Sequence, residues 1–154
     1  MKFDMFMVDL DGVLADFDAG VKAITGGLPH EIHKRDMWKA ITSKKNFFEE
    51  LALTHDALEL WAYLNNTGKQ ITILTGLPTM NDGAEQKRRW VKKHFGDVPC
   101  IVLPSKDKRL HAAPNRILID DRHDMINGWL EAKGYAILHT STESTIQQLS
   151  SIGF

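Results

Sequence analysis

The chain has 154 residues, of which 43% are hydrophobic and 25% are charged, and its formal net charge is −1. This composition is typical of one globular domain with a single core. The balanced charge gives no global reason to expect a nucleic acid or an anionic membrane as a partner.

The single cysteine, Cys100, excludes a disulfide within the chain. No apolar run approaches the roughly 20 residues that a membrane-spanning helix needs. The first residues, MKFDMFMVDLDG, carry acids where a secretory signal needs an unbroken apolar stretch. We therefore expect a cytoplasmic protein that does not act at a membrane.

Five apolar runs have the composition of β-strands. They cover residues 5–10, 70–76, 100–104, 116–121 and 135–139, and each is bounded by turn residues or polar clusters. Helical patterns that end on glycine separate the later runs, at residues 82–96 and 124–134. This alternation predicts an α/β fold, a doubly wound parallel sheet of five strands with helices on both faces.

The segment between the first two runs contains helical patterns and no strand pattern. It is too long for a simple crossover between neighbouring strands. We therefore predict a small helical cap at residues 16–67, inserted after the first strand, and a core formed by residues 1–15 and 68–154.

Aspartates follow two of the apolar runs. Asp9 and Asp11 close the first, and Asp120 and Asp121 close the fourth. Doubly wound sheets bind ligands at the carboxyl ends of their strands, and four carboxylates there would repel one another. A divalent cation relieves that repulsion, and oxygen ligands without paired Cys or His favour Mg²⁺ over zinc. An isolated Asp-Gly would indicate only a turn, but an acid inside an apolar run is costly to desolvate.

The motifs resemble those of a known family. VDLDGVLADF (8–17) looks like the first motif of the haloacid dehalogenase-like (HAD) phosphohydrolases, and its extended form is similar to that of the 5'(3')-deoxyribonucleotidases. Further similar segments follow in that family's order: NFFEEL (46–51), ITILTG (71–76), KRRWVKKHFG (87–96), VLPSKDK (102–108) and LIDDRHDMINGW (118–129).

The resemblance implies roles for the four aspartates. Asp9 would attack phosphorus and form an aspartyl phosphate, and Asp11 would protonate the leaving oxygen and later activate water. Asp120 would complete a Mg²⁺ shell with Asp9 and the backbone carbonyl of Asp11, and Asp121 would hold a metal-bound water. Residues i and i+2 project from one side of an extended segment, which fits this division between Asp9 and Asp11.

Further site residues follow from the same resemblance. The Thr75 hydroxyl and the Gly76 amide would donate hydrogen bonds to phosphoryl oxygens. Gly76 departs from the serine that is more common in those nucleotidases. A lysine of the third motif would offset the charge of the aspartate and the phosphoryl group; Lys108 matches the pattern, and Lys106 is the alternative.

Two more residues are candidates for substrate binding. Phe17 occupies the position from which similar nucleotidases stack on a base. Arg88, in a basic helical segment, is a candidate for contact with a substrate phosphate or base, although most of that segment is typical of a solvated face.

Together these features predict a Mg²⁺-dependent phosphomonoesterase that acts on nucleoside monophosphates. A phosphatase for another small metabolite such as a sugar phosphate, a nucleic-acid end phosphatase and a non-catalytic phosphate-binding module are the alternatives. A helical cap admits a mononucleotide but obstructs a polymer, so we expect a small phosphorylated substrate and no nucleic acid.

Overall fold

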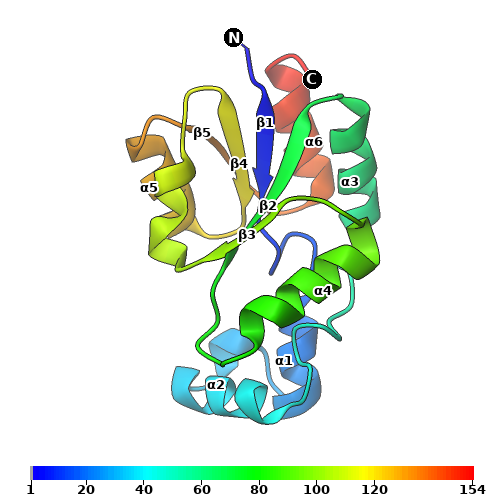
Figure 1. The fold of residues 1–154 in the computed structure, drawn as a ribbon, viewed down its shortest axis with the longest axis vertical. Helices are drawn as coiled ribbons and strands as arrows, with labels where there is room; N and C mark the ends of the chain where they lie inside the picture. The colour runs from blue at the N-terminus through cyan, green and yellow to red at the C-terminus, as the bar shows by residue number, and fades with distance from the viewer. Residues whose placement is uncertain (1) are drawn as a thin grey trace.

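The computed structural model describes residues 2–154, which form a five-stranded parallel sheet with helices on both faces (Figure 1). The strands are β1 (Met5–Val8), β2 (Gln70–Gly76), β3 (Cys100–Leu103), β4 (Arg116–Asp120) and β5 (Tyr135–Leu138). Their order in the sheet is β3-β2-β1-β4-β5, and every neighbouring pair is parallel. The predicted α/β doubly wound fold is confirmed.

The helices lie between and beside the strands. They are α1 (Phe17–Thr25), α2 (Lys34–Ser43), α3 (Ala57–Asn66), α4 (Gly83–Phe95), α5 (His123–Glu131) and α6 (Thr142–Ser151), with two 3₁₀ helices, η1 (Pro29–Glu31) and η2 (Ser105–His111). In the described residues none of these helices is long and apolar enough to cross a membrane.

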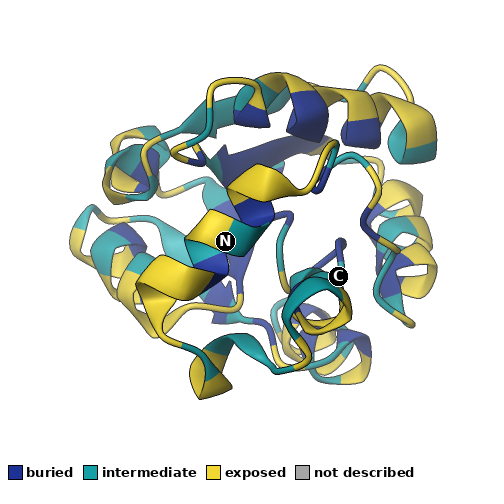
Figure 2. Cartoon of the chain, turned by 90° about the horizontal axis from the view of Figure 1, so that it is seen from below, coloured by how far each residue is buried: buried dark blue, intermediate teal, exposed yellow. Residues whose placement is uncertain are grey.

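Two apolar cores cover the two faces of the sheet. The larger combines side chains of the sheet, such as Phe6 and Ile73, with residues of α3, α4 and α6. The smaller places Trp129 of α5 against Met7 and Leu118. Figure 2 shows buried residues along the strands and on the inner faces of the helices. Because successive residues of a strand face opposite sides, one short strand such as β1 contributes to both cores.

The central strand β1 ends earlier than the apolar run suggests. The prediction extended it to residue 10, but it ends at Val8, and the Leu10 carbonyl accepts hydrogen bonds from the amides of residues 13, 14 and 15. Gly12 follows with a φ of 84°, a conformation that favours glycine. Asp11 forms an isolated bridge with Ala15 outside β1, so the strand is two residues shorter than the predicted run, and the turn follows Asp11.

The predicted cap segment divides in two. Helices α1 and α2 contact each other below the carboxyl ends of the strands, whereas α3 packs against α6 beside the sheet (Figure 1). The buried face of α3 supplies Leu60 and Leu64 to the larger core, which explains why it belongs with the sheet. The cap over the carboxyl edge therefore consists of α1, η1, α2 and the turns that follow them.

Candidate active site

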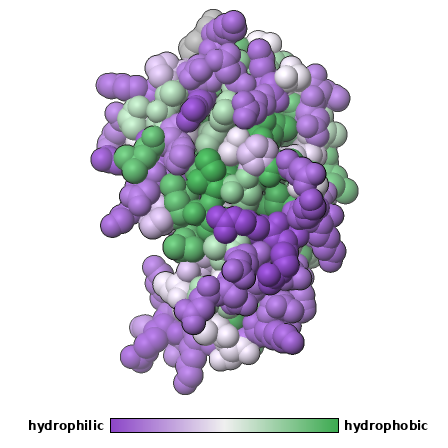
Figure 3. All heavy atoms as spheres, viewed as in Figure 1, coloured by the Kyte–Doolittle hydropathy of each residue, from purple (hydrophilic) through white to green (hydrophobic). Residues whose placement is uncertain are grey.

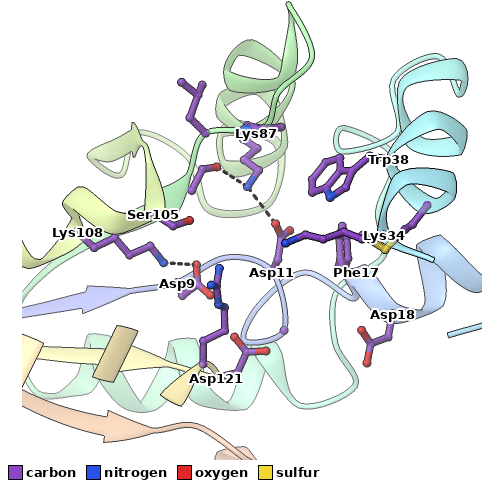
Figure 4. A pocket seen from close by; sticks show the side chains of 16 residues that line it. Asp9, Asp11, Phe17, Asp18, Lys34, Trp38, Lys87, Ser105, Lys108 and Asp121 are labelled. Carbon is purple, nitrogen blue, oxygen red and sulfur yellow. Dashed lines mark hydrogen bonds and ion pairs between the residues drawn. The ribbon is translucent and has the colours of Figure 1, made fainter. Parts of the chain in front are cut away.

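A pocket of about 310 Å³ lies where the carboxyl ends of the strands meet α1 and α2. Its walls come from the turn after β1, the ends of β2 and β4, η2, α4 and the cap (Figure 4). An indentation between the sheet body and the lower, mostly hydrophilic lobe is visible on the left of Figure 3. The volume falls at the lower end of the range for small-molecule sites.

Asp9 is held by a buried lysine. Its Oδ1 accepts a hydrogen bond of 2.9 Å from Lys108 Nζ, which donates another of 2.8 Å to Oδ2 of Asp120. Burial alone would lower the pKa of Lys108, but the charges and hydrogen bonds of Asp9 and Asp120 outweigh it and raise that pKa above its usual value. Lys108 is therefore a cation shared by two buried carboxylates. Lys106, the alternative, is exposed and does not line the pocket.

Asp11 is held by a second lysine, which the sequence analysis did not select. Lys87 Nζ lies 3.0 Å from Asp11 Oδ2, 2.9 Å from Thr75 Oγ1 and 2.8 Å from the Gly76 carbonyl oxygen. It also stands 5.0 Å from the centre of the Phe48 ring. The other oxygen of Asp11, Oδ1, is buried and has no hydrogen-bond partner among residues 2–154. One oxygen of Asp11 is thus anchored by Lys87, and the other is buried without a partner in residues 2–154.

The helical period of α4 explains why Lys87 lies inside. The buried positions of this helix are Gly83, Gln86, Lys87, Trp90 and Val91. Lys87 precedes Trp90 and Val91 by three and four residues, so all three share one face. Arg88, the predicted contact, lies one position further on; it is exposed and is not among the residues that line the pocket.

Three carboxylates form a candidate cation site. Asp9, Asp120 and Asp121 each place an oxygen within 4.8 Å of the others. Burial and the charge of Asp9 raise the pKa of Asp120 to about 7, although Lys108 lowers it. Desolvation and the negative charges of Asp9 and Asp120 raise the pKa of Asp121 to about 7 as well. Crowded oxygen ligands whose ionisation is costly fit a hard divalent cation.

Thr75 and Gly76, at the end of β2, were both expected to bind phosphoryl oxygens, but only Gly76 lines the pocket. Thr75 is fully buried and does not line the pocket; its hydroxyl accepts the hydrogen bond from Lys87. Gly76 does line the pocket, beside Ser105 of η2. A direct bond from the Thr75 hydroxyl to a phosphoryl oxygen stays a prediction, whereas its contact with Lys87 is a structural fact.

The cap places aromatic rings in the pocket wall. Phe17, the first residue of α1, and Trp38 of α2 both line it, and their ring centres are 6.4 Å apart. Phe17 also packs edge-on against Phe47, at 6.0 Å, and stacks near Phe48, at 6.3 Å. Phe17 thus joins the cap's aromatic cluster while one side of it faces the pocket. Sequence reasoning did not select Trp38 as a pocket residue.

Solved hydrolases share this fold. A hydrolase from Streptococcus pneumoniae TIGR4 is similar over 97% of this chain and 100% of its own, with a TM-score of 0.61 and 16% identity. A HAD-superfamily hydrolase from Ehrlichia chaffeensis is similar over 99% of this chain and 98% of its own, with a TM-score of 0.61 and 13% identity. The fold is therefore that of the HAD-like hydrolases, as the motifs predict.

Comparison of the sequence with known families identifies the family within the HAD-like hydrolases. Residues 28–148 match the family described as 5' nucleotidase, deoxy (pyrimidine), cytosolic type C protein, and the chain belongs to that family. The mitochondrial 5'(3')-deoxyribonucleotidase of Mus musculus is 32% identical over 170 residues, which cover 93% of this chain and 76% of the mouse protein. The chain is a phosphatase of the nucleotidase type.

Proposed function

We propose that this protein is a Mg²⁺-dependent phosphomonoesterase that hydrolyses nucleoside monophosphates through an aspartyl phosphate on Asp9. One observation carries the mechanism: Asp9 and Asp11 line the same pocket, and each is bound to its own buried lysine. Two carboxylates that are separately anchored in this way suit two separate tasks, attack on phosphorus and proton transfer.

In the first step an oxygen of Asp9 attacks phosphorus, and the bond from phosphorus to the ester oxygen breaks. Protonated Asp11, which lines the same pocket as Asp9, gives its proton to the departing alkoxide. In the second step ionised Asp11 takes a proton from water, the resulting hydroxide attacks phosphorus, and the bond from phosphorus to the Asp9 oxygen breaks. Phosphate leaves, Asp9 is again a carboxylate and Asp11 is again protonated. Lys108 stays beside Asp9 and stabilises charge that develops on the phosphoryl oxygens.

The carboxylates of Asp9, Asp120 and Asp121 would hold the Mg²⁺, with the backbone carbonyl of Asp11 as a further proposed ligand. When bound, the ion supplies positive charge that offsets the phosphoryl oxygens and polarises the phosphorus centre. Lys108 occupies one oxygen of Asp9 and one of Asp120. The second oxygen of Asp120, Oδ1, accepts a hydrogen bond of 3.1 Å from the Arg122 amide and has a further lone pair for a cation.

The substrate is proposed from the cap. Phe17 and Trp38 provide aromatic surface opposite the carboxylates, where a base would stack while its phosphate meets Asp9 (Figure 4). The mouse relative's name describes a 5'(3')-deoxyribonucleotidase, and the matched family's description names pyrimidine, so deoxyribonucleotides with pyrimidine bases are the first substrates to test. The small pocket supports a mononucleotide as the substrate over a polymer. We also propose a cytoplasmic location.

A substrate panel tests the proposed function. Phosphate release is measured for ribo- and deoxyribonucleoside 5'- and 3'-monophosphates and for sugar phosphates, with Mg²⁺ and with EDTA. We expect release from nucleotides, dependent on Mg²⁺. A preference for sugar phosphates would make the protein a general metabolite phosphatase, and release that EDTA leaves unchanged would contradict the metal requirement.

Mg²⁺ should stabilise the fold in a pH-dependent way. With the pKa values of Asp120 and Asp121 raised from 3.8 to about 7 in the fold, the folded chain binds more protons than the unfolded chain between these values. Without the ion, the free energy of unfolding therefore falls as pH rises through this window. Mg²⁺ binds the ionised carboxylates, so the rise in Tm on adding it should be larger at pH 8 than at pH 5.

At a hundredfold excess over Kd, the expected gain at pH 8 is about 2.7 kcal/mol, or roughly 5 to 11 °C in Tm. Thermal melts with and without Mg²⁺ measure it. Asp121→Asn should reduce the gain, and an equal shift at both pH values would count against ionised aspartates as the ligands.

Phe17→Leu should separate nucleotides from simple phosphate esters. Leucine keeps an apolar side chain against Phe47 and Phe48 but removes the ring face, worth about 1 to 3 kcal/mol in base stacking. We expect kcat/KM for the best nucleotide to fall roughly tenfold to a hundredfold, with little change for p-nitrophenyl phosphate. Equal losses for both substrates, together with a lower Tm, would assign Phe17 to packing alone.

A further inference from the structure

The Ser105 hydroxyl occupies the space that a side chain at residue 76 would need. Gly76 ends β2, and Ser105 begins η2, just after β3. These strands are parallel neighbours in which Gly76 pairs with Leu103, so their ends reach the pocket together. A β-carbon built on Gly76 would overlap Oγ of Ser105, while it would stand 3.7 Å from the Ser105 Cβ, an ordinary contact. Only the hydroxyl oxygen fills that space.

In the described part of the chain, residues 2–154, this hydroxyl has no hydrogen-bond partner. The hydrogen bonds among the polar groups of the pocket run from Lys87 to Asp11, Thr75 and Gly76, from Lys108 to Asp9 and Asp120, and from the Arg122 amide to Asp120. Within residues 2–154 none of these bonds uses Ser105, although Ser105 lines the pocket. Figure 4 shows its side chain between Lys108 and Lys87, on the side of the pocket that faces Asp9.

We propose that Ser105 is a phosphate-binding residue whose hydroxyl donates a hydrogen bond to a phosphoryl oxygen of the substrate. This inference rests on the proposed function of the pocket as a phosphatase site. It also gives Gly76 a role: the absence of a side chain at residue 76 is what allows the Ser105 hydroxyl to reach this position. Residues 76 and 105 then form one unit, in which a single hydroxyl serves the phosphoryl group.

A rescue experiment tests this unit with p-nitrophenyl phosphate and the best nucleotide. Ser105→Ala should lower kcat/KM for both substrates by roughly tenfold to a hundredfold, the value of one hydrogen bond to a charged group. The loss should be similar for the two substrates because they share only the phosphoryl group. Tm should stay near the wild-type value, because no hydrogen bond within residues 2–154 is lost.

Two double variants combine Ser105→Ala with a substitution at residue 76, whose new side chain enters the space that the Ser105 hydroxyl leaves. Since the Ser105 Cβ leaves room for a β-carbon at residue 76, Ser105→Ala with Gly76→Ser returns one hydroxyl from the end of β2 instead of from η2. Ser105→Ala with Gly76→Ala is the matched control, which fills the same space without a hydroxyl. We expect the serine double variant to be several-fold more active than the alanine double variant.

Binding of inorganic phosphate, measured by calorimetry on the same variants, makes the test independent of turnover. Weaker binding by Ser105→Ala, and stronger binding by the serine double variant than by the alanine one, supports the proposal. Equal phosphate binding by wild type and Ser105→Ala, or equal binding by the two double variants, overturns it. A wild-type protein that binds phosphate but hydrolyses no ester would instead overturn the proposed function.

Discussion

Asp9→Asn should reduce phosphate release by at least about three orders of magnitude, or about 4 kcal/mol in activation free energy. The substitution keeps the shape of the side chain and an oxygen that can accept the hydrogen bond from Lys108, which is 2.9 Å long in the wild type. It removes the negative charge that attacks phosphorus, and it weakens one member of the cluster formed with Asp120 and Asp121. Turnover of the best nucleotide with saturating Mg²⁺ measures the loss.

Asp4→Asn is a matched control for this variant. Asp4 lies just before the other end of β1, is exposed, and accepts a hydrogen bond from the Asn115 side chain. The same chemical change there should leave turnover near the wild-type value. If Asp9→Asn kept near wild-type activity with Mg²⁺, an aspartyl phosphate on this residue would be wrong, and an unfolded variant would be recognised by its melting curve.

The sheet was predictable because its strands are buried on both faces. The runs at residues 70–76 and 116–121 have mostly apolar centres, ITIL and ILI, and the observed strands β2 and β4 agree with these limits to within one residue. The end of β1 was not predictable. The chain turns at Leu10, whose carbonyl accepts backbone hydrogen bonds, and because Leu10 is itself apolar the turn cannot be seen in the apolar pattern. The position of α3 was also missed, because an amphipathic helix packs as well on a sheet as in a cap.

The site was predictable where its residues follow strands. Asp9, Asp120 and Asp121 lie together because the carboxyl ends of β1 and β4 are neighbours. Lys87 was not predicted, although it lies next to Arg88, the residue that was. The apolar residues Trp90 and Val91 define the buried face of α4, and residue 87 lies on that face. Ser105 could not be found in this way, because its approach to Gly76 depends on how η2 leaves β3.

The two lysines of η2 should differ sharply when each is replaced by alanine. Lys108 is buried and bonded to Asp9 and Asp120, whereas Lys106 is exposed outside the pocket. Removal of one preorganised electrostatic group costs about 2.7 to 4 kcal/mol, so Lys108→Ala should lower kcat roughly 100- to 1,000-fold. Lys106→Ala, a matched change two residues away, should stay within a few-fold of wild type.

Stability supplies a second measurement on the same pair. Lys108→Ala leaves two buried carboxylates without their shared cation, a change that typically costs about 3 to 5 kcal/mol. The variant should therefore melt at a lower temperature, and its Tm should recover at low pH, because the raised pKa of Asp120 lets that carboxyl group take up a proton there. Lys106→Ala should melt like the wild type at every pH. Since Lys108 is the only lysine of η2 in contact with Asp9 among residues 2–154, a larger loss of kcat in Lys106→Ala than in Lys108→Ala would contradict the arrangement of this site.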